Sequence, residues 1–266
     1  MVDTAEPAKG TRPEGARNEA EASQKVRQMF TQIAPKYDLL NHLLSMQLDR
    51  LWRARVARKL KPILRRTDGT VLDLCCGTGD MALALAGAGP ARVFAADFAH
   101  PMLVQAKDKS PARISFLEAD ALRLPFADSS FDLVTAAFGF RNLANYEVGL
   151  REMRRVLKPG GTLAILEFTE PPEGFLGDVY RWYFRRVLPR IGGMLSGDRD
   201  AYTYLPKSVS RFFRPEQLAR LMESVGYVGV SYRVWTMGTV ALHIAKRNAT
   251  VLNRLVVNDV AMESSK

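Results

Sequence analysis

A short apolar run that passes into a glycine-rich turn constrains the fold of this chain more than any other feature of its sequence. The run is Val71-Leu72-Asp73-Leu74, and Cys75-Cys76-Gly77-Thr78-Gly79-Asp80 follows it directly. Glycines in such a turn adopt positive φ without steric cost and let a ligand approach the backbone closely. Because a helical pattern follows at 80–88, the segment predicts a strand over Thr70–Leu74, a ligand-binding loop and a helix in succession.

Strand and helix patterns continue to alternate along the chain. Helical patterns at 100–109 and 145–157 separate some of the next four apolar runs, which are Arg92–Asp97, Arg113–Leu117, Phe131–Phe138 and Thr162–Phe168. Strands that alternate with helices form parallel sheets through βαβ units. After a helix expected at 215–225, two adjacent strands at about 227–236 and 239–246 form a hairpin. The prediction is an α/β fold with a mostly parallel seven-stranded sheet, a C-terminal antiparallel hairpin and helices on both faces.

Composition divides the chain into one folded domain and two tails. Residues 1–22 lack apolar periodicity and are predicted to be a disordered tail. From Ser23 onward apolar residues recur at helical spacing, and a second helix with a basic outer face is expected over Leu48–Leu64. Residues 23–247 should form one domain whose N-terminal helices act as a lid, and 248–266 should be a C-terminal tail.

Length, hydropathy and cysteine content exclude several classes of protein. With 266 residues, 47% of them hydrophobic, the chain can bury one sizeable core. No apolar run reaches the length of about 18 residues that a membrane-spanning helix needs. The polar segment from Met1 to Arg17 does not resemble a secretory signal. Cys75 and Cys76 are adjacent, so they predict neither a disulfide framework nor a zinc cluster, and we expect a cytoplasmic protein.

The net charge of +10 is unevenly distributed. Residues 1–22 carry three basic and five acidic side chains, so the rest of the chain carries +12. Asp49–Arg66 holds eight basic residues against one acidic residue, and Phe175–Arg220 holds nine against four. Such a body is attracted to anionic partners, either nucleic acid or an anionic membrane surface. The alternative is that these residues form ordinary solvated helix faces.

The residues around the glycine turn favour S-adenosylmethionine over a dinucleotide. Gly77-x-Gly79-x-x-Ala82 fits the loose dinucleotide pattern, and Asp97 ends the second strand where a carboxylate can accept both ribose hydroxyls. Asp73, however, lies inside the first strand, where it can steady the loop or the ammonium group of the ligand. Asp120-Ala121 follows the third strand and suits an adenine amino group. Together these features are typical of class I methyltransferases, although Asp73 and Asp120 could each serve only as capping or turn residues.

The chain resembles a narrower family, the quinone-biosynthesis C-methyltransferases that act on demethylmenaquinol and on polyprenyl-benzoquinols. The resemblance covers about Val26 to Lys246 and rests on an ordered set of motifs. They are Tyr37-Asp38-Leu39-Leu40-Asn41, Leu72 to Asp80, Phe138-Gly139-Phe140-Arg141-Asn142, Arg155 to Gly161, Leu166-Glu167-Phe168, Leu188-Pro189 and Val240-Ala241-Leu242-His243.

The resemblance implies a Rossmann-like fold with S-adenosylmethionine as co-substrate. No metal is expected, because the sulfonium methyl group is already electrophilic. The resemblance also implies that Thr78, Asp97 and the pair Asp120-Ala121 contact the co-substrate, beside Asp73, Gly77 and Gly79. Ala137 stands where some relatives have Ser, so only a main-chain contact is expected there. The double cysteine is more similar to menaquinone-pathway members than to ubiquinone-pathway members. The implied activity is therefore methylation of demethylmenaquinol, with the benzoquinol step of ubiquinone biosynthesis as a second reaction.

Carbon methylation of a quinol needs a positioned, electron-rich ring. A quinol hydroxyl has a pKa of about 10, like tyrosine, and a neighbouring cation lowers that value. Arg141, just beyond the fourth strand, is predicted to orient the quinol or stabilise its phenolate, with Asn142 beside it. The alternative is that Arg141 forms a structural ion pair and Asn142 caps the following helix.

Arginine is a poor proton acceptor because its pKa exceeds 12. The candidates for a general base are Tyr37 and Asp38 on the N-terminal lid, His42, and His243. The alternative for Tyr37 and Asp38 is an ordinary turn at the entry to a helix. His243 sits in an apolar run and is interpreted first as a core histidine, while His100 marks the start of a helix. Cys75 and Cys76 are interpreted as packed loop residues, since no basic partner is evident. The sequence does not identify the base.

A lipid-like substrate gives the basic and aromatic segments a purpose. Phe175 to Arg190 interleaves aromatic and aliphatic residues with arginines, which is typical of a helix lying in an anionic interface. Peripheral attachment to the inner face of the membrane is therefore expected, with no nucleic acid partner, and a homo-oligomer is left open. A core-packing helix with a basic edge is the alternative. Rival functions are RNA or other small-molecule methylation, or a non-catalytic scaffold that binds S-adenosylmethionine.

Overall fold

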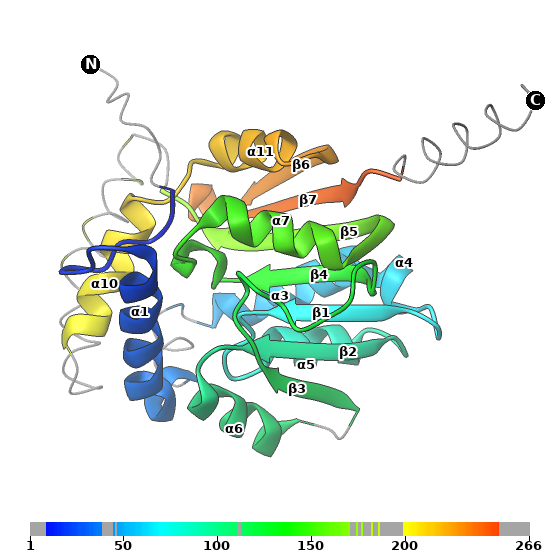
Figure 1. The fold of residues 1–266 in the computed structure, drawn as a ribbon, viewed down its shortest axis with the longest axis horizontal. Helices are drawn as coiled ribbons and strands as arrows, with labels where there is room; N and C mark the ends of the chain where they lie inside the picture. Colours follow the sequence, from blue (N-terminus) through cyan, green and yellow to red (C-terminus); the bar gives the residue numbers. More distant parts are fainter. Residues whose placement is uncertain are drawn as a thin grey trace, which may run out of the picture.

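Seven strands form one mixed sheet in the order β3-β2-β1-β4-β5-β7-β6 (Figure 1). This computed structural model describes residues 9–38, 45, 47–110, 113–170, 174, 177, 182, 186 and 199–249. The strands are β1 (Thr70–Leu74), β2 (Arg92–Asp97), β3 (Ile114–Glu118), β4 (Phe131–Ala137), β5 (Leu157–Phe168), β6 (Tyr227–Trp235) and β7 (Val240–Arg247). The first five are parallel, and β7 runs antiparallel to both β5 and β6. The predicted fold class is confirmed.

The helices follow the apolar periodicity of the sequence. They are α1 (Glu19–Ile33), α3 (Leu48–Lys59), α4 (Lys61–Leu64), α5 (Asp80–Gly87), α6 (His100–Lys109), α7 (Tyr146–Val156), α10 (Arg199–Ser210) and α11 (Pro215–Ser224), with short 3-10 turns η1 (Ala34–Lys36), η2 (Phe140–Asn142) and η4 (Thr236–Gly238). Asn18 and Asn145 are N-caps whose side chains accept a backbone N–H from the first turns of α1 and α7.

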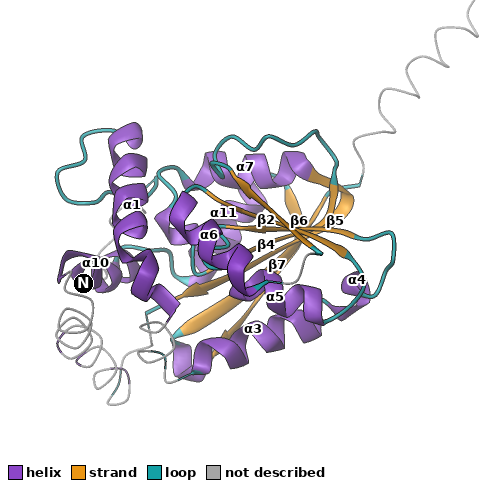
Figure 2. Cartoon of the chain, turned by 90° about the horizontal axis from the view of Figure 1, so that it is seen from below, coloured by secondary structure: helices purple, strands orange, loops and turns teal. Residues whose placement is uncertain are grey.

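Two hydrophobic layers cover the sheet. On one face, α7 and α11 bury Leu150, Met153, Leu218 and Met222 against the strands. On the other face, α3 and α5 contribute Trp52, Val56, Met81 and Leu85. Figure 2 shows these two helix pairs on opposite sides of the sheet, while α1 and α10 stand apart at one end of it. Helices α1, α6 and α10 share a third, smaller cluster that includes Ile33, Met102 and Val209.

Three boundaries differ from the prediction by more than one residue. Helix α1 begins at Glu19, and Thr11 is already buried, so the predicted disordered tail over 1–22 is wrong from residue 9 onward. Backbone hydrogen bonds hold the first of these residues, and such bonds leave no hydrophobic pattern in the sequence. The helix expected over 48–64 breaks at Leu60, because Pro62 lacks the N–H that would continue it. Strand β5 begins at Leu157 rather than Thr162.

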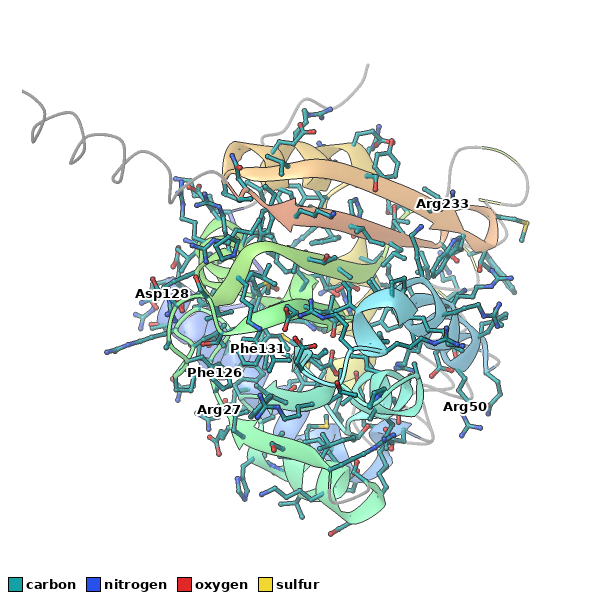
Figure 3. The ribbon with its side chains drawn as sticks, turned by 90° about the vertical axis from the view of Figure 1, so that its right-hand side faces the viewer. Arg27, Arg50, Phe126, Asp128, Phe131 and Arg233 are labelled. Atoms are coloured by element: carbon teal, nitrogen blue, oxygen red, sulfur yellow. The ribbon has the colours of Figure 1, made fainter. Side chains whose placement is uncertain are left out.

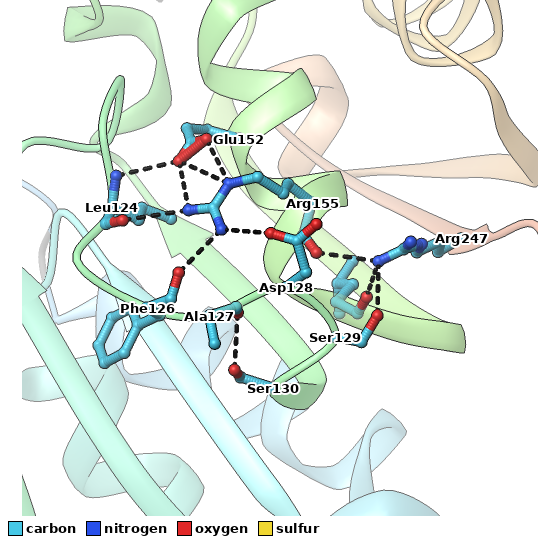
Figure 4. Close-up of polar contacts among 10 residues, drawn as sticks. Leu124, Phe126, Ala127, Asp128, Ser129, Ser130, Glu152, Arg155 and Arg247 are labelled. Atoms are coloured by element: carbon cyan, nitrogen blue, oxygen red, sulfur yellow. Dashed lines mark hydrogen bonds and ion pairs between the residues drawn. The ribbon is translucent and has the colours of Figure 1, made fainter.

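Arg155 anchors the end of the sheet opposite to α1. Its guanidinium donates to the carboxylates of Glu152 and Asp128 and to the carbonyls of Leu124 and Phe126 (Figure 4). Phe126 in turn packs edge to face on Phe131, with ring centroids 4.9 Å apart (Figure 3). Arg155 therefore fastens the connection between β3 and β4 to α7, so this arginine has a structural role.

Candidate active site

A cavity opens at the carboxyl ends of the parallel strands, beneath α1 and η1. Open α/β sheets bind their ligands at this edge. Five segments line the cavity: the α1–η1 region (Ser23, Phe30, Tyr37), the end of β1 and the glycine loop (Leu74, Cys75, Gly77), the end of β2 and start of α6 (Ala96, Asp97, Phe98, Met102), the segment after β3 (119–122) and the segment after β4 (Phe138, Gly139, 142–144). Of the predicted site residues, Tyr37, Gly77, Asp97, Asp120, Ala121 and Asn142 thus meet in one cavity.

The glycine loop turns sharply into α5. Gly79 is the N-cap of α5 with φ +87°, and a Cβ there would lie 3.2 Å from the Cβ of Ala106. A larger residue would therefore be strained in both backbone and packing. Thr78, which does not line the cavity, donates its hydroxyl to Asp38 of the lid.

Asp97 joins the end of β2 to the loop. Its Oδ2 accepts the N–H of Gly77 at 2.8 Å, and its Oδ1 accepts the N–H of Ala99 at 2.9 Å. Burial raises the pKa of Asp97, against the lowering effect of these backbone N–H groups. The carboxylate is thus held in place at the cavity wall.

Asp73 lies beneath the cavity rather than in its wall. The Thr135 hydroxyl donates to Asp73 Oδ1 at 2.7 Å, while Oδ2 is buried with no hydrogen-bond partner within the described part of the chain. Burial raises the pKa of Asp73 to about 7. A buried carboxyl with one oxygen left without a hydrogen-bond donor is costly, and a nearby cation on a ligand would compensate for it.

These residues fit S-adenosylmethionine. The molecule carries an ammonium group, a sulfonium centre, a ribose diol and an adenine amino group, and each favours a carboxylate or carbonyl acceptor. Asp97 and Asp120 supply such acceptors in the cavity wall, and Asp73 adds negative charge below it. Asp120 uses Oδ1 to accept the N–H of Leu122 at 2.9 Å, which orients its carboxylate.

Arg141 is buried beside the cavity and ion-paired. Its Nη1 lies 2.7 Å from Glu167 Oε1, it also donates to the carbonyl of Phe138, and its Nε donates to the Ser208 hydroxyl at 3.3 Å. Burial alone would lower the pKa of Arg141, but the carboxylate of Glu167 outweighs it and the pKa is raised. The structural ion pair considered from the sequence is therefore present, and the guanidinium stays charged.

Asn142 projects into the cavity and is held from behind by α10. The Tyr204 hydroxyl donates to Asn142 Oδ1 at 3.0 Å. The helix cap expected of Asn142 belongs instead to Asn145, whose side chain accepts the N–H of Val148. Neither Tyr204 nor Glu167 was identified as a site residue from the sequence, although Glu167 lies inside one of the motifs that carry the resemblance.

The lid segment is fastened to the glycine loop by charge. Lys109 on α6 donates at 2.6 Å both to Asp38 and to Asp80 at the start of α5. Tyr37 lies over the loop, since a Cβ on Gly77 would come 3.7 Å from its ring.

Of the remaining residues that the structure describes, His243, His100 and Ala137 do not line the cavity, whereas Cys75 does. His243 is buried in β7 with Nε2 2.9 Å from the carbonyl of Pro215, as expected for a core histidine. His100 opens α6, and His42 falls outside the described residues. Ala137 packs against the α3–α5 layer and is not in the cavity wall. Burial raises the pKa of both cysteine thiols, which supports their interpretation as packed loop residues.

The sheet order, the glycine loop and the carboxylates around it define a class I S-adenosylmethionine-dependent methyltransferase. The chain belongs to the ubiE/COQ5 methyltransferase family, whose model matches residues 18–247. A demethylmenaquinone methyltransferase of Thermus thermophilus is 52% identical over 82% of this chain and 100% of its own length. A ubiquinone/menaquinone biosynthesis C-methyltransferase of Geobacter sulfurreducens is 42% identical over 85% and 90%.

Solved structures agree on the fold. A methyltransferase from Thermotoga maritima that depends on S-adenosylmethionine matches with a TM-score of 0.61 at 20% identity, covering 84% of this chain and all of its own. A phosphoethanolamine N-methyltransferase of Haemonchus contortus, bound to S-adenosylmethionine, matches with a TM-score of 0.53 and covers 71% of this chain and 51% of its own chain. Among the described residues, no helix is long and apolar enough to cross a membrane.

Proposed function

We propose that this enzyme methylates a ring carbon of reduced demethylmenaquinol, the methyl-accepting step of menaquinone biosynthesis. The observation that carries the substrate assignment is the relative from Thermus thermophilus, which is named for this substrate and is 52% identical over its full length. A similar relative from Deinococcus radiodurans, 47% identical over 93% of its length, bears the same name. The benzoquinol step is a second activity, supported by the Geobacter sulfurreducens relative named for both pathways.

S-adenosylmethionine, when bound, supplies an electrophilic methyl group. Asp97, Asp120 and the backbone of Gly77 and Ala121 would hold its ribose and adenine, and Asp73 would favour its cationic end from below. The lid residues Tyr37 and Phe30 close the cavity above it and exclude water. The contribution of these residues is to fix the ring carbon and the methyl group in line.

Arg141 and Asn142 act on the quinol oxygen. A permanently charged guanidinium close to that oxygen favours the phenolate and so makes the adjacent ring carbon more nucleophilic. Asn142, in the cavity wall, orients the oxygen by hydrogen bonding. Arg141 is tied to Glu167 and does not take the proton, because a guanidinium with a raised pKa does not act as a base.

Among the candidates that the structure describes, Tyr37 is the best placed to receive or relay the quinol proton. Tyr37 lines the cavity, whereas the Asp38 carboxylate accepts from both Thr78 and Lys109. His243 is buried in β7 against the carbonyl of Pro215 and does not line the cavity. A Tyr37→Phe variant should therefore lose activity and retain affinity for S-adenosylmethionine.

Peripheral membrane attachment accompanies a lipid substrate. Helix α3 exposes Arg50, Arg55 and Arg58, and Leu51 on the same helix is 44% exposed. Trp52 donates to Thr236, which places the 68%-exposed Met237 near that helix. Arg50 and Arg233 project on the same side of the view in Figure 3. The interfacial helix expected over 175–190 lies outside the described residues except for Gly177, Trp182 and Arg186.

An anaerobic assay with methyl-labelled S-adenosylmethionine tests the assignment. Reduced demethylmenaquinol, a reduced demethylated benzoquinol and bulk RNA are compared as acceptors. Label in demethylmenaquinol, with or without label in the benzoquinol and with none in RNA, is the expected result. Label only in RNA would establish the RNA methyltransferase alternative, and tight cofactor binding with no labelled acceptor would favour a scaffold.

Pelleting with anionic vesicles at low and high salt tests the membrane proposal. RNA binding falls steeply with salt, whereas lipid binding retains an apolar contribution at high salt.

A further inference from the structure

A short N-terminal segment outside the family match is fastened to the loop that carries Arg141 and Asn142. This segment, residues 9–12, is called the strap below; the family model begins only at residue 18. The Thr11 N–H donates to the carbonyl of Leu143 at 2.8 Å, and the Tyr146 N–H donates to the carbonyl of Lys9 at 2.9 Å. The Arg12 guanidinium donates to the carbonyl of Ala144 at 2.9 Å. The strap thus pairs with the backbone immediately after Asn142.

The approach of the two backbones is close. A Cβ on Gly10 would lie 1.9 Å from the carbonyl oxygen of Ala144, so only glycine fits at that position. Thr11 is 7% exposed although it lies in a stretch without apolar periodicity. The strap therefore sits at a fixed depth, with its threonine hydroxyl facing inward.

That hydroxyl meets Tyr204, and Tyr204 meets Asn142. Thr11 Oγ1 and Tyr204 Oη are 2.8 Å apart, and Tyr204 Oη donates to Asn142 Oδ1 at 3.0 Å. A hydroxyl has one proton to donate. Because Tyr204 donates its proton to Asn142, the Thr11 hydroxyl must donate to Tyr204. Both hydrogen bonds therefore run in one direction, from Thr11 through Tyr204 to Asn142.

The direction of this chain decides which end of the Asn142 amide faces the cavity. With Oδ1 turned toward Tyr204, the Nδ2 group has no hydrogen-bond partner among the residues that the structure describes, and Asn142 lines the cavity. Tyr204 itself does not line the cavity, so it acts through Asn142.

We propose that Thr11 and Tyr204 are positioning residues that lock the Asn142 amide with its two N–H donors toward the reacting quinol oxygen. The identity of that oxygen rests on the proposed function, whereas the locked amide does not. An oxygen that gains negative charge during methyl transfer is stabilised by preorganised N–H donors. If the amide were free to turn over, its carbonyl would face the same oxygen and repel it.

Matched variants separate positioning from stability. Tyr204→Phe and Thr11→Val each break the chain, whereas Thr11→Ser keeps the hydroxyl. Tyr227→Phe is the control, because Tyr227 is a buried tyrosine whose hydroxyl also donates one hydrogen bond, to the carbonyl of Leu150 at 3.1 Å, and it does not line the cavity. Each breaking variant should lower kcat about tenfold, the size expected for one neutral hydrogen bond. Affinity for S-adenosylhomocysteine should stay within about twofold, and Thr11→Ser should restore kcat.

Two further measurements make the inference falsifiable. When Tyr204→Phe is added to Asn142→Ala, kcat should fall by less than a further factor of about two, because the two residues act as one unit. The side-chain amide signals of Asn142 in a nitrogen-15 spectrum, identified by their loss in Asn142→Ala, should shift in Tyr204→Phe and Thr11→Val but not in Thr11→Ser or Tyr227→Phe. Unshifted signals, or a full tenfold effect in the Asn142→Ala background, would overturn the inference. Shifted signals in a protein that does not methylate quinols would overturn the proposed function and leave the locked amide standing.

Discussion

Glu167 and Arg141 form an ion pair inside the protein, with Oε1 and Nη1 2.7 Å apart and with exposures of 1% and 6%. The second oxygen of Glu167 accepts the backbone N–H of Arg141 at 3.1 Å. One carboxylate therefore fixes both the side chain and the main chain of the residue expected to act on the substrate. β5 thus sets the geometry of the loop after β4.

Replacing Glu167 should destabilise the protein far more than replacing a surface carboxylate. Glu167→Gln leaves a buried guanidinium without a counter-charge and should lower the free energy of unfolding by about 3 kcal/mol. The control is Glu147→Gln, which removes the partner of Arg151 from a pair in which both side chains are more than half exposed. That change should cost less than about 1 kcal/mol. Urea denaturation of both variants measures the difference, and equal losses would refute the buried pair.

Asp73 should make the unliganded protein less stable as pH rises. Its pKa is about 7 in the folded protein against 3.8 in an exposed carboxyl, so the folded state binds this proton more tightly. The stabilisation that comes from this bound proton is complete below pH 3.8, the pKa of the exposed carboxyl, and is lost as pH rises through about 7. Asp73→Asn cannot ionise at this position. Its free energy of unfolding should therefore rise relative to that of the wild type between about pH 4 and about pH 8.

Asp132 supplies a control of opposite sign. Burial alone would raise its pKa, but hydrogen bonds from Lys158 and Thr70 lower it below 3.8. Its stabilisation is therefore present above that value and is lost as pH falls through the lowered pKa. The free energy of unfolding of Asp132→Asn should lie below that of the wild type by a constant amount over the pH range in which that of Asp73→Asn rises relative to the wild type. Parallel stability curves for Asp73→Asn and the wild type would show that Asp73 does not titrate in this range.

The strands and the cofactor loop could be predicted from the sequence because their causes are local. β1 and β2 match the expected bounds, since each is an apolar run that ends at a glycine loop or at Asp97. The contacts behind Asn142 could not be predicted in the same way. Thr11 and Tyr204 are 193 residues apart in the chain, and no periodicity links them. The strap was interpreted as a disordered tail because backbone hydrogen bonds leave no pattern in residue type.

Arg155 should matter for stability and not for the active site. Lysine at this position keeps the charge but cannot reproduce the fork that reaches two carboxylates and two carbonyls. Arg155→Lys should lower the free energy of unfolding by about 2 kcal/mol, since it leaves several acceptors without a donor. Arg151→Lys, on the same helix and paired with exposed Glu147, is the matched control and should change the free energy of unfolding by less than about 0.5 kcal/mol. Affinity for S-adenosylhomocysteine should be unchanged in both; a loss in Arg155→Lys would mean that the anchored connection reaches the cavity.

Lys109 should control how long the cofactor stays bound. Its ammonium group lies 2.6 Å from both Asp38 of the lid and Asp80 of α5, so it joins the two across the mouth of the glycine loop. Lys109→Met removes this link and leaves two carboxylates facing each other, which should open the lid and raise the dissociation rate of S-adenosylhomocysteine about fivefold. Lys107→Met, an exposed lysine on the same helix, is the control for the loss of one positive charge. Stopped-flow displacement measures both rates. A faster release in Lys109→Met alone supports a lid held by this residue, whereas equal rates in the two variants would mean that Asp38 and Asp80 are joined without functional consequence.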